Sequence, residues 1–152
     1  MKLSLRGEYA LRALIELAEA KPEDIVPIQS VSKRQQIPKR FLEQILNDLR
    51  SGGFVESKRG IAGGYRLARP SREITLFQVI KHIEGGFASV PQSSGQQSRL
   101  QPGALEAQLV VQAAMKEAQD AVEKVLIGIT LANLSDKARQ LRNQDQVVDY
   151  NI

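Results

Sequence analysis

Hydrophobic residues recur at intervals of three and four near the start of the chain, which is the spacing of one buried face of an α-helix. Leu14 and Leu17 follow this spacing, and Ser4 can cap a helix over about 5–20 because its hydroxyl can accept a hydrogen bond from the first turn. A polar segment interrupts the pattern, which then returns. The sequence therefore predicts a second, shorter helix over about 28–36.

The most amphipathic stretch begins at Pro38, a residue that suits the first turn of a helix and ends the preceding one. At 100° per residue, a helix from there to about residue 51 has an apolar side and a side rich in groups that can bond to bases. The apolar side comprises Phe41, Leu42, Ile45, Leu46 and Leu49, and the other side carries Arg40, Glu43, Gln44, Asn47 and Ser51. Three helices with a short connector before the third give the order of a helix-turn-helix. An ordinary amphipathic core helix explains this stretch, taken alone, equally well.

Two strand-like runs follow, over about 54–58 and 65–68. The six residues between them, 59–64, are rich in glycine and predict a hairpin turn. The glycines match neither the phosphate-binding P-loop nor the dinucleotide-binding fingerprint, so a nucleotide site is not expected here. A third helix followed by a basic two-stranded ribbon is typical of a winged helix-turn-helix.

The remainder of the chain predicts further helices separated by a polar segment. Thr75 and Gln78 form a capping-box pattern, which predicts a fourth helix to about Glu84. Serine, glutamine, glycine and proline then dominate, a composition that buries little and favours a flexible loop. The expected organisation is a winged helix-turn-helix domain at 1–86, a flexible loop at 87–103, dimerisation helices at 104–142 and an unassigned tail at 143–152.

A long helix is expected at about 104–128, and one of its faces has the 3.5-residue period of a coiled-coil seam. Because a helix of this length cannot bury itself fully on so small a domain, we expect the seam to pair with its copy in a homodimer. Packing of the helix on its own chain is the alternative. The seam residues are Val111, Met115, Ala118, Val122, Val125 and Ile129.

Composition and charge narrow the function. The fold class is mainly α with a small β-wing, and 42% hydrophobic with 25% charged residues is ordinary for a globular protein. The net charge of +4 is uneven, because residues 1–72 hold 14 Lys/Arg against 8 Asp/Glu whereas 73–152 hold 7 against 9. A basic first half fits a head that binds a polyanion. No apolar run approaches a membrane span or a signal-peptide core, so we expect a cytoplasmic protein without a membrane partner.

These motifs together resemble the Rrf2 family of bacterial transcriptional regulators, which are dimeric winged-helix proteins. The resemblance covers most of residues 1–142 apart from the 87–103 loop. The segments that carry it are 3–11, 41–46, 49–53, 59–67 and 129–134.

The resemblance implies roles for individual residues. Family members insert the third helix into the major groove, which implies base reading by Arg40, Glu43 and Gln44. Glu43 matches a base-reading carboxylate, and a carboxylate can accept a hydrogen bond from cytosine; a surface pair with Lys39 is its alternative. The wing implies DNA contacts by Lys58, Arg59 and Arg66, with Arg59 suited to a narrow minor groove. Phosphate contacts are expected from Lys33, Arg34 and Lys39.

One family feature is missing from the sequence. Many members hold an iron–sulfur cluster through three cysteines in the loop before the dimerisation helix, but this chain has no cysteine at all. Glu8 matches a position where some relatives supply a carboxylate ligand, and alone it cannot assemble a cluster. We therefore expect no cofactor, and the family includes members without a cluster.

The function expected from the sequence is that of a homodimeric, sequence-specific transcriptional regulator, a repressor, that binds double-stranded DNA without an iron–sulfur cluster. The alternative is a protein-interaction module of winged-helix fold for which DNA is secondary. An enzyme is not expected, because the chain has no cysteine and no paired carboxylates in a recognisable nucleophilic or metal arrangement. Its single histidine, His82, lies outside the apolar stripe of its helix and is expected at the surface. The regulating signal stays open between a small-molecule effector, a protein partner and constitutive repression.

Overall fold

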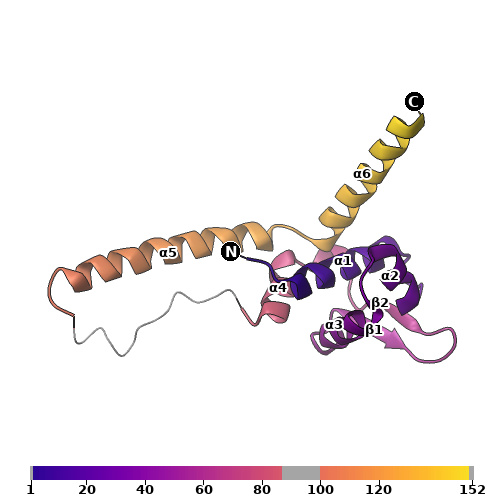
Figure 1. The fold of residues 1–152 in the computed structure, drawn as a ribbon, viewed down its shortest axis with the longest axis horizontal. Helices are drawn as coiled ribbons and strands as arrows, with labels where there is room; N and C mark the ends of the chain where they lie inside the picture. The colour runs from indigo at the N-terminus through magenta and orange to yellow at the C-terminus, as the bar shows by residue number, and fades with distance from the viewer. Residues whose placement is uncertain (1, 87–99, 151–152) are drawn as a thin grey trace.

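The computed structural model describes residues 2–86 and 100–150, with the side chains of 2–86 and 100–145. Within these residues the chain forms six α-helices, one short 3₁₀ turn and a two-stranded sheet. Figure 1 shows a head built from the first part of the chain, with two long helices leaving it in different directions. The predicted class, mainly α with a small β-wing, is confirmed.

The head contains the elements in the predicted order. Three helices come first, then the hairpin, then a fourth helix. These elements are α1 (Leu5–Glu19), α2 (Ile28–Gln35), α3 (Lys39–Ser51), β1 (Val55–Lys58), β2 (Gly64–Leu67), η1 (Ser71–Glu73) and α4 (Leu76–Glu84).

Local sequence signals explain where α1 and α4 begin. The Ser4 hydroxyl accepts a hydrogen bond from the Gly7 amide at 3.0 Å, which confirms the predicted cap. At α4, the Thr75 hydroxyl accepts from the Gln78 amide while the Gln78 side chain accepts from the Thr75 amide, at 3.2 and 3.1 Å. The predicted capping box is therefore present.

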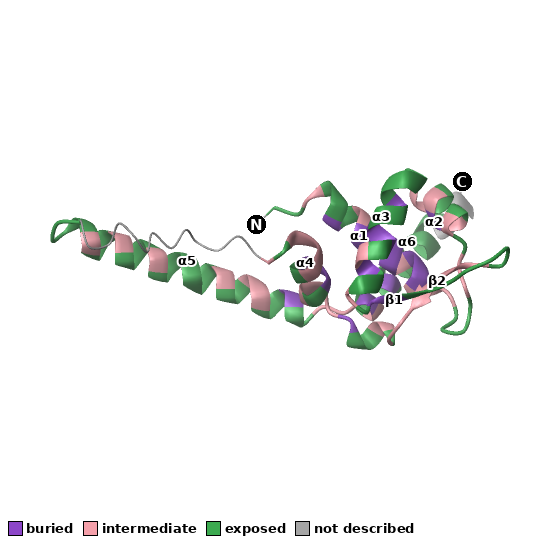
Figure 2. Cartoon of the chain, turned by 90° about the horizontal axis from the view of Figure 1, so that it is seen from below, coloured by how far each residue is buried: buried purple, intermediate pink, exposed green. Residues whose placement is uncertain are grey.

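The core lies where α1, α3 and α4 meet, as the buried residues in Figure 2 show. Leu42, Leu46 and Leu49 of α3 are fully buried there. Phe41 is a correction to the sequence analysis, because its side chain is 55% exposed instead of packed in the core. At 100° per residue it lies about 90° from the centre of the buried side, at the edge of the apolar stripe.

The wing is tied to the segment before α2. Strands β1 and β2 pair antiparallel, with Val55 opposite Leu67 and Lys58 opposite Gly64. We call the strand ends next to the turn, at Lys58 and Gly64, the wing root, because the loop projects from there. Beside it, Val26 and Tyr65 exchange two backbone hydrogen bonds of 2.8 and 2.9 Å. This close approach requires glycine next to Tyr65, because a Cβ on Gly64 would overlap the Val26 carbonyl oxygen.

Helix α5 (Ala104–Ile127) follows the predicted bounds and projects away from the head, so that most of its surface is exposed (Figures 1 and 2). Its last turns reach the head, where Leu126 is buried and Val122 packs against the core. A backbone hydrogen bond of 2.8 Å from the Leu76 amide to the Ile129 carbonyl anchors the segment that follows.

Helix α6 (Leu131–Tyr150) is longer than predicted. The sequence predicts an end near residue 142 and no structure for 143–152, whereas the helix continues to Tyr150. The segment contains neither glycine nor proline, so nothing in it ends a helix. Residues 87–99 of the predicted loop lie outside the described residues. None of the described helices combines the length and apolarity that a membrane crossing requires.

Candidate nucleic-acid interface

A tight turn between α2 and α3 sets the direction of the third helix. Gln36 ends α2 in the left-handed conformation, with a φ of 53°. The Ser32 hydroxyl donates to the Ile37 carbonyl at 2.7 Å, and the Ile37 amide donates to the Ser32 carbonyl at 3.1 Å. Ile37 itself is buried. The turn is thus closed by its own hydrogen bonds and by a hydrophobic anchor.

The opposite end of α3 is held by polar side chains from two other helices. Asp48 lies 2.6 Å from the Arg6 guanidinium of α1. His82 of α4 lies with Nε2 2.9 Å from the Asp48 carbonyl oxygen and 3.1 Å from its carboxylate. Because both partners accept, Nε2 carries the proton and donates. The single histidine, a partly exposed residue, therefore connects α4 to the last turn of α3.

Outward from this support, α3 presents the three predicted base-reading residues. Arg40, Glu43 and Gln44 are all exposed and lie on one side of the helix, at positions i, i+3 and i+4. Among the ion pairs of the described residues, Glu43 has none with Lys39, so the carboxylate is open to another donor.

The wing places two of its three predicted DNA contacts in the open. Lys58 and Arg59 are exposed at the end of β1 and the start of the turn. Arg66 instead pairs with Glu56 across the hairpin, with Nε 3.0 Å from the carboxylate. At the wing tip, Ile61 is fully exposed.

The predicted phosphate contacts fall into two groups. Lys33 and Lys39 are exposed, and within the described part of the chain neither forms an ion pair. Arg34 is also exposed, but its Nε lies 3.0 Å from the buried carboxylate of Glu16 on α1. This arginine therefore ties α2 to α1.

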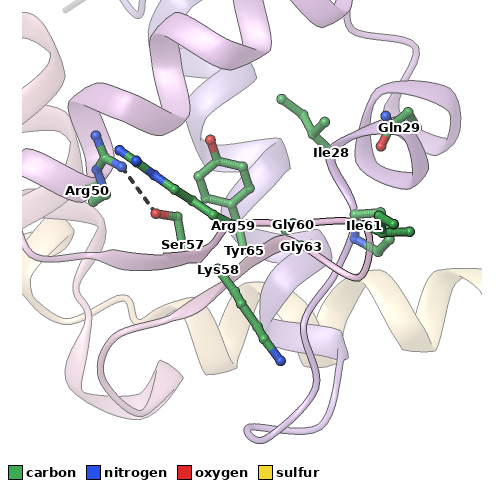
Figure 3. A pocket seen from close by; sticks show the side chains of 12 residues that line it. Ile28, Gln29, Arg50, Ser57, Lys58, Arg59, Gly60, Ile61, Gly63 and Tyr65 are labelled. Carbon is green, nitrogen blue, oxygen red and sulfur yellow. Dashed lines mark hydrogen bonds between the residues drawn. The ribbon is translucent and has the colours of Figure 1, made fainter.

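Sequence reasoning missed Arg50, in the last turn of α3. Its Nη1 donates to the Ser57 hydroxyl of β1 at 3.1 Å, and both residues line a cavity of about 320 Å³ beside the wing root. In Figure 3 the Arg59 side chain runs towards this pair, with Tyr65 alongside. The helical wheel carried the signal, since Arg50 lies on the edge of α3 opposite to Phe41.

The predicted dimer seam is largely uncovered in the single chain. Val111, Met115 and Val125 are 61%, 51% and 62% exposed, and Ala118 is exposed too. Val122 and Ile129 are half-buried at the head end of the seam. The opposite side of α5 is mixed: it has an ion pair of 2.9 Å between Lys116 and Asp120 and also the exposed Leu109 and Ile127. Asp120 raises the pKa of Lys116 by accepting its hydrogen bond.

The available donor groups do not fit a cysteine-ligated iron–sulfur cluster. The chain contains no cysteine. Among the described residues, no group of three or more His, Asp or Glu side chains could hold a metal ion. Glu8, the one position with a possible ligand counterpart in relatives, instead pairs with Arg12 at 3.5 Å.

Solved structures with the same fold are transcriptional regulators. T. potens IscR matches with a TM-score of 0.71 and 30% identity, over 91% of this chain and 88% of that one. CymR, the global cysteine regulator of B. subtilis, matches with a TM-score of 0.69 and 30% identity, over 90% of this chain and 98% of that one. The winged-helix architecture is therefore that of DNA-binding regulators, and these neighbours are not enzymes.

Sequence comparisons give the same result. IscR of Cereibacter sphaeroides is 44% identical over 86 residues, which are 55% of this chain and 56% of that protein. The chain thus spans little more than half the length of several relatives that it matches. A Synechocystis protein, whose name also assigns it to the HTH-type regulators, is 32% identical over 91% of this chain and 90% of its own. Residues 3–137 match the Rrf2 family, described as iron-dependent transcriptional regulators, and the chain belongs to that family.

Proposed function

We propose that this protein is a homodimeric, sequence-specific DNA-binding repressor that acts in the cytoplasm without an iron–sulfur cluster. The observation that carries the proposal is the joint exposure of the α3 face and the wing. Arg40, Glu43 and Gln44 offer a guanidinium, a carboxylate and an amide from one helical face, and these groups match base edges in the major groove. The exposed Lys58 and Arg59 of the wing add positive charges that can contact the phosphates of the DNA backbone.

Dimerisation would bring two such surfaces to one DNA site. The exposed α5 seam supports this step, because valine, methionine and alanine side chains repeat at 3.5-residue spacing on a helix that the head does not cover. Small residues such as Ala118 allow a second helix to approach closely. Two recognition helices related by a two-fold axis would then read a pseudo-palindrome in successive major grooves.

The absence of cysteine supports control by a signal other than a cysteine-ligated cluster. Because the family description includes iron dependence, the direct check is iron content and visible absorption of protein purified without oxygen, followed by DNA binding before and after chelation. We expect no cluster absorption and unchanged binding. Cluster absorption with chelator-sensitive binding would overturn this part of the proposal.

The second candidate is a protein-interaction module of winged-helix fold for which DNA is secondary. The exposed Phe41 of α3 and Ile61 of the wing tip favour it. Mobility-shift titration against salt separates the two candidates. A DNA-binding regulator gives a steep negative slope of log affinity against log salt, and Lys58→Ala reduces that slope by about 0.9 for each lost phosphate contact. Weak binding with the same affinity for every DNA sequence would favour the protein-binding module.

A further inference from the structure

We propose that the cavity beside the wing root is a seat for one backbone phosphate of the bound DNA, with Arg50 as its anchoring cation. The inference rests on the proposed DNA-binding function and adds a contact at the junction of α3, β1 and the segment before α2. The cavity of about 320 Å³ is lined by Arg50, Lys58 and Arg59, and none of its lining residues is acidic. In Figure 3 the side chains of Arg50 and Arg59 approach each other, whereas the Lys58 side chain runs the opposite way. Two guanidinium groups close together raise the local positive potential and attract an anion.

The geometry of Arg50 suits an oxyanion. Its Nη1 bond to the Ser57 hydroxyl, at 3.1 Å, fixes one edge of the guanidinium against β1. A guanidinium has five N–H donors, so the rest of its fork stays available for a phosphate oxygen. Figure 3 shows Arg59 directed towards the same place. Among the ion pairs of the described residues, neither arginine has a carboxylate partner that would neutralise it.

The fold keeps this space open and adds donors on its other wall. The bridge between Val26 and Tyr65 holds the wing root against the start of α2. Pro27 precedes α2 without a side-chain hydrogen bond, and Ile28 and Gln29 of the first turn line the cavity, so the first-turn amides have no capping side-chain oxygen. A water takes about 30 Å³ in the liquid, so the volume suits a phosphate group with several waters.

The occupant that this chemistry favours is a DNA phosphate, because the cavity adjoins both the recognition helix and the wing. A free phosphate-bearing solute has the same chemistry. DNA in which one phosphate linkage is neutral separates the two occupants. The neutral linkage weakens binding if the cavity holds that DNA phosphate, and it has no effect if the cavity holds a soluble anion.

The test combines Arg50→Gln with operator DNA in which single phosphates are replaced by methylphosphonates. In wild-type protein, one methylphosphonate per half-site should weaken binding about 5- to 10-fold, whereas in Arg50→Gln the same replacement should have no further effect. Arg50→Gln should make the slope of log affinity against log salt less negative by about 0.9 per half-site and should keep the base preference. Arg50→Lys should restore the slope, because the charge returns.

Arg139→Gln, which removes an exposed arginine of α6 that pairs with Asp136, is the matched control and should leave binding unchanged. If no methylphosphonate position loses its effect in Arg50→Gln while wild type still binds specifically, the phosphate seat is wrong and the proposed function stands. If inorganic phosphate binds wild type but not Arg50→Gln in calorimetry and the DNA slope is unchanged, the seat takes a free anion and the proposal is overturned. If wild-type protein binds no specific DNA, both inferences fail.

Discussion

Arg34 and Glu16 form an ion pair between α2 and α1, with Nε 3.0 Å from a carboxylate that is only 6% exposed. The side-chain amide of Gln35 donates a hydrogen bond of 2.8 Å to the same carboxylate. Arg34, which we expect from the sequence to contact a DNA phosphate, therefore has an acidic partner within its own protein. Its neighbour Lys33 is free of such a pair among the described residues, so the two positions differ in a way that experiment can separate.

Arg34→Ala should lower the free energy of unfolding by about 1 kcal/mol, because a nearly buried carboxylate loses one of its two partners and the exposed arginine moderates the cost. Lys33→Ala, its matched control, should leave stability within about 0.5 kcal/mol and reduce the salt slope of DNA binding more than Arg34→Ala does. Denaturant unfolding and mobility-shift titration measure the two effects. An equal loss of slope in both variants would show that Arg34 contacts DNA as well.

Gly64→Ala should displace the wing from the head. The added Cβ would overlap the Val26 carbonyl oxygen, so the bridge between Val26 and Tyr65 must open or shift. We expect a loss of about 1–3 kcal/mol in unfolding free energy together with weaker binding to every DNA sequence. Ala62→Ser adds one atom at the exposed tip and serves as the control. Unchanged stability and binding in Gly64→Ala would mean that the wing root is not held as described.

Ala118→Glu should prevent dimerisation. Ala118 lies in the exposed seam of α5, and a carboxylate there would lose hydration in the dimer without gaining a partner. The dimer dissociation constant should rise about 100-fold or more, as measured by sedimentation. Ala113→Glu makes the same change on the side of α5 opposite the seam, at an exposed position near Lys116 and Glu117, and should leave the dimer intact. A wild-type monomer at micromolar concentration would contradict the seam itself.

Arg142→Gln should loosen α6 from the head. Its guanidinium donates two hydrogen bonds of 2.8 and 2.7 Å to the Glu19 carboxylate, which raises the pKa of Arg142. A raised pKa in the folded state means that this stabilisation is complete below the usual pKa of arginine and is lost only as the pH rises through the raised value. At neutral pH the substitution should therefore remove the whole pair, worth about 0.5–1 kcal/mol for a half-exposed arginine. Hydrogen exchange in α1 and α6 should speed up, whereas Arg139→Gln should leave α1 exchange unchanged.

The fold was largely predictable because local signals repeat at each boundary. Ser4, Pro38 and Thr75 place the starts of three helices from chemistry that acts within a few residues. Phe41 was placed wrongly because a helical period defines the centre of a buried face better than its edges. The length of α6 was missed because a polar helix without glycine or proline gives no stop signal.

The candidate site was predictable in outline and not in its pairing. Exposure of Glu43, Gln44 and Lys58 follows from helical and strand periodicity alone. The partners of Arg34 and Arg66 depend on which elements pack together, which is a tertiary property. The cavity next to Arg50 depends on the approach of the wing root to Val26, and no periodicity in the chain indicates that contact.

The most direct test of the account is selection of genomic fragments by wild-type protein and by Glu43→Ala. Wild type should enrich a pseudo-palindromic motif with half-sites spaced by about one helical turn or a multiple of it. Glu43→Ala should enrich the same motif with base preference relaxed at one position in each half-site, a loss of about 1–3 kcal/mol of discrimination. Enrichment of fragments that share no motif would contradict sequence-specific recognition, and an identical motif in both proteins would contradict base reading by Glu43.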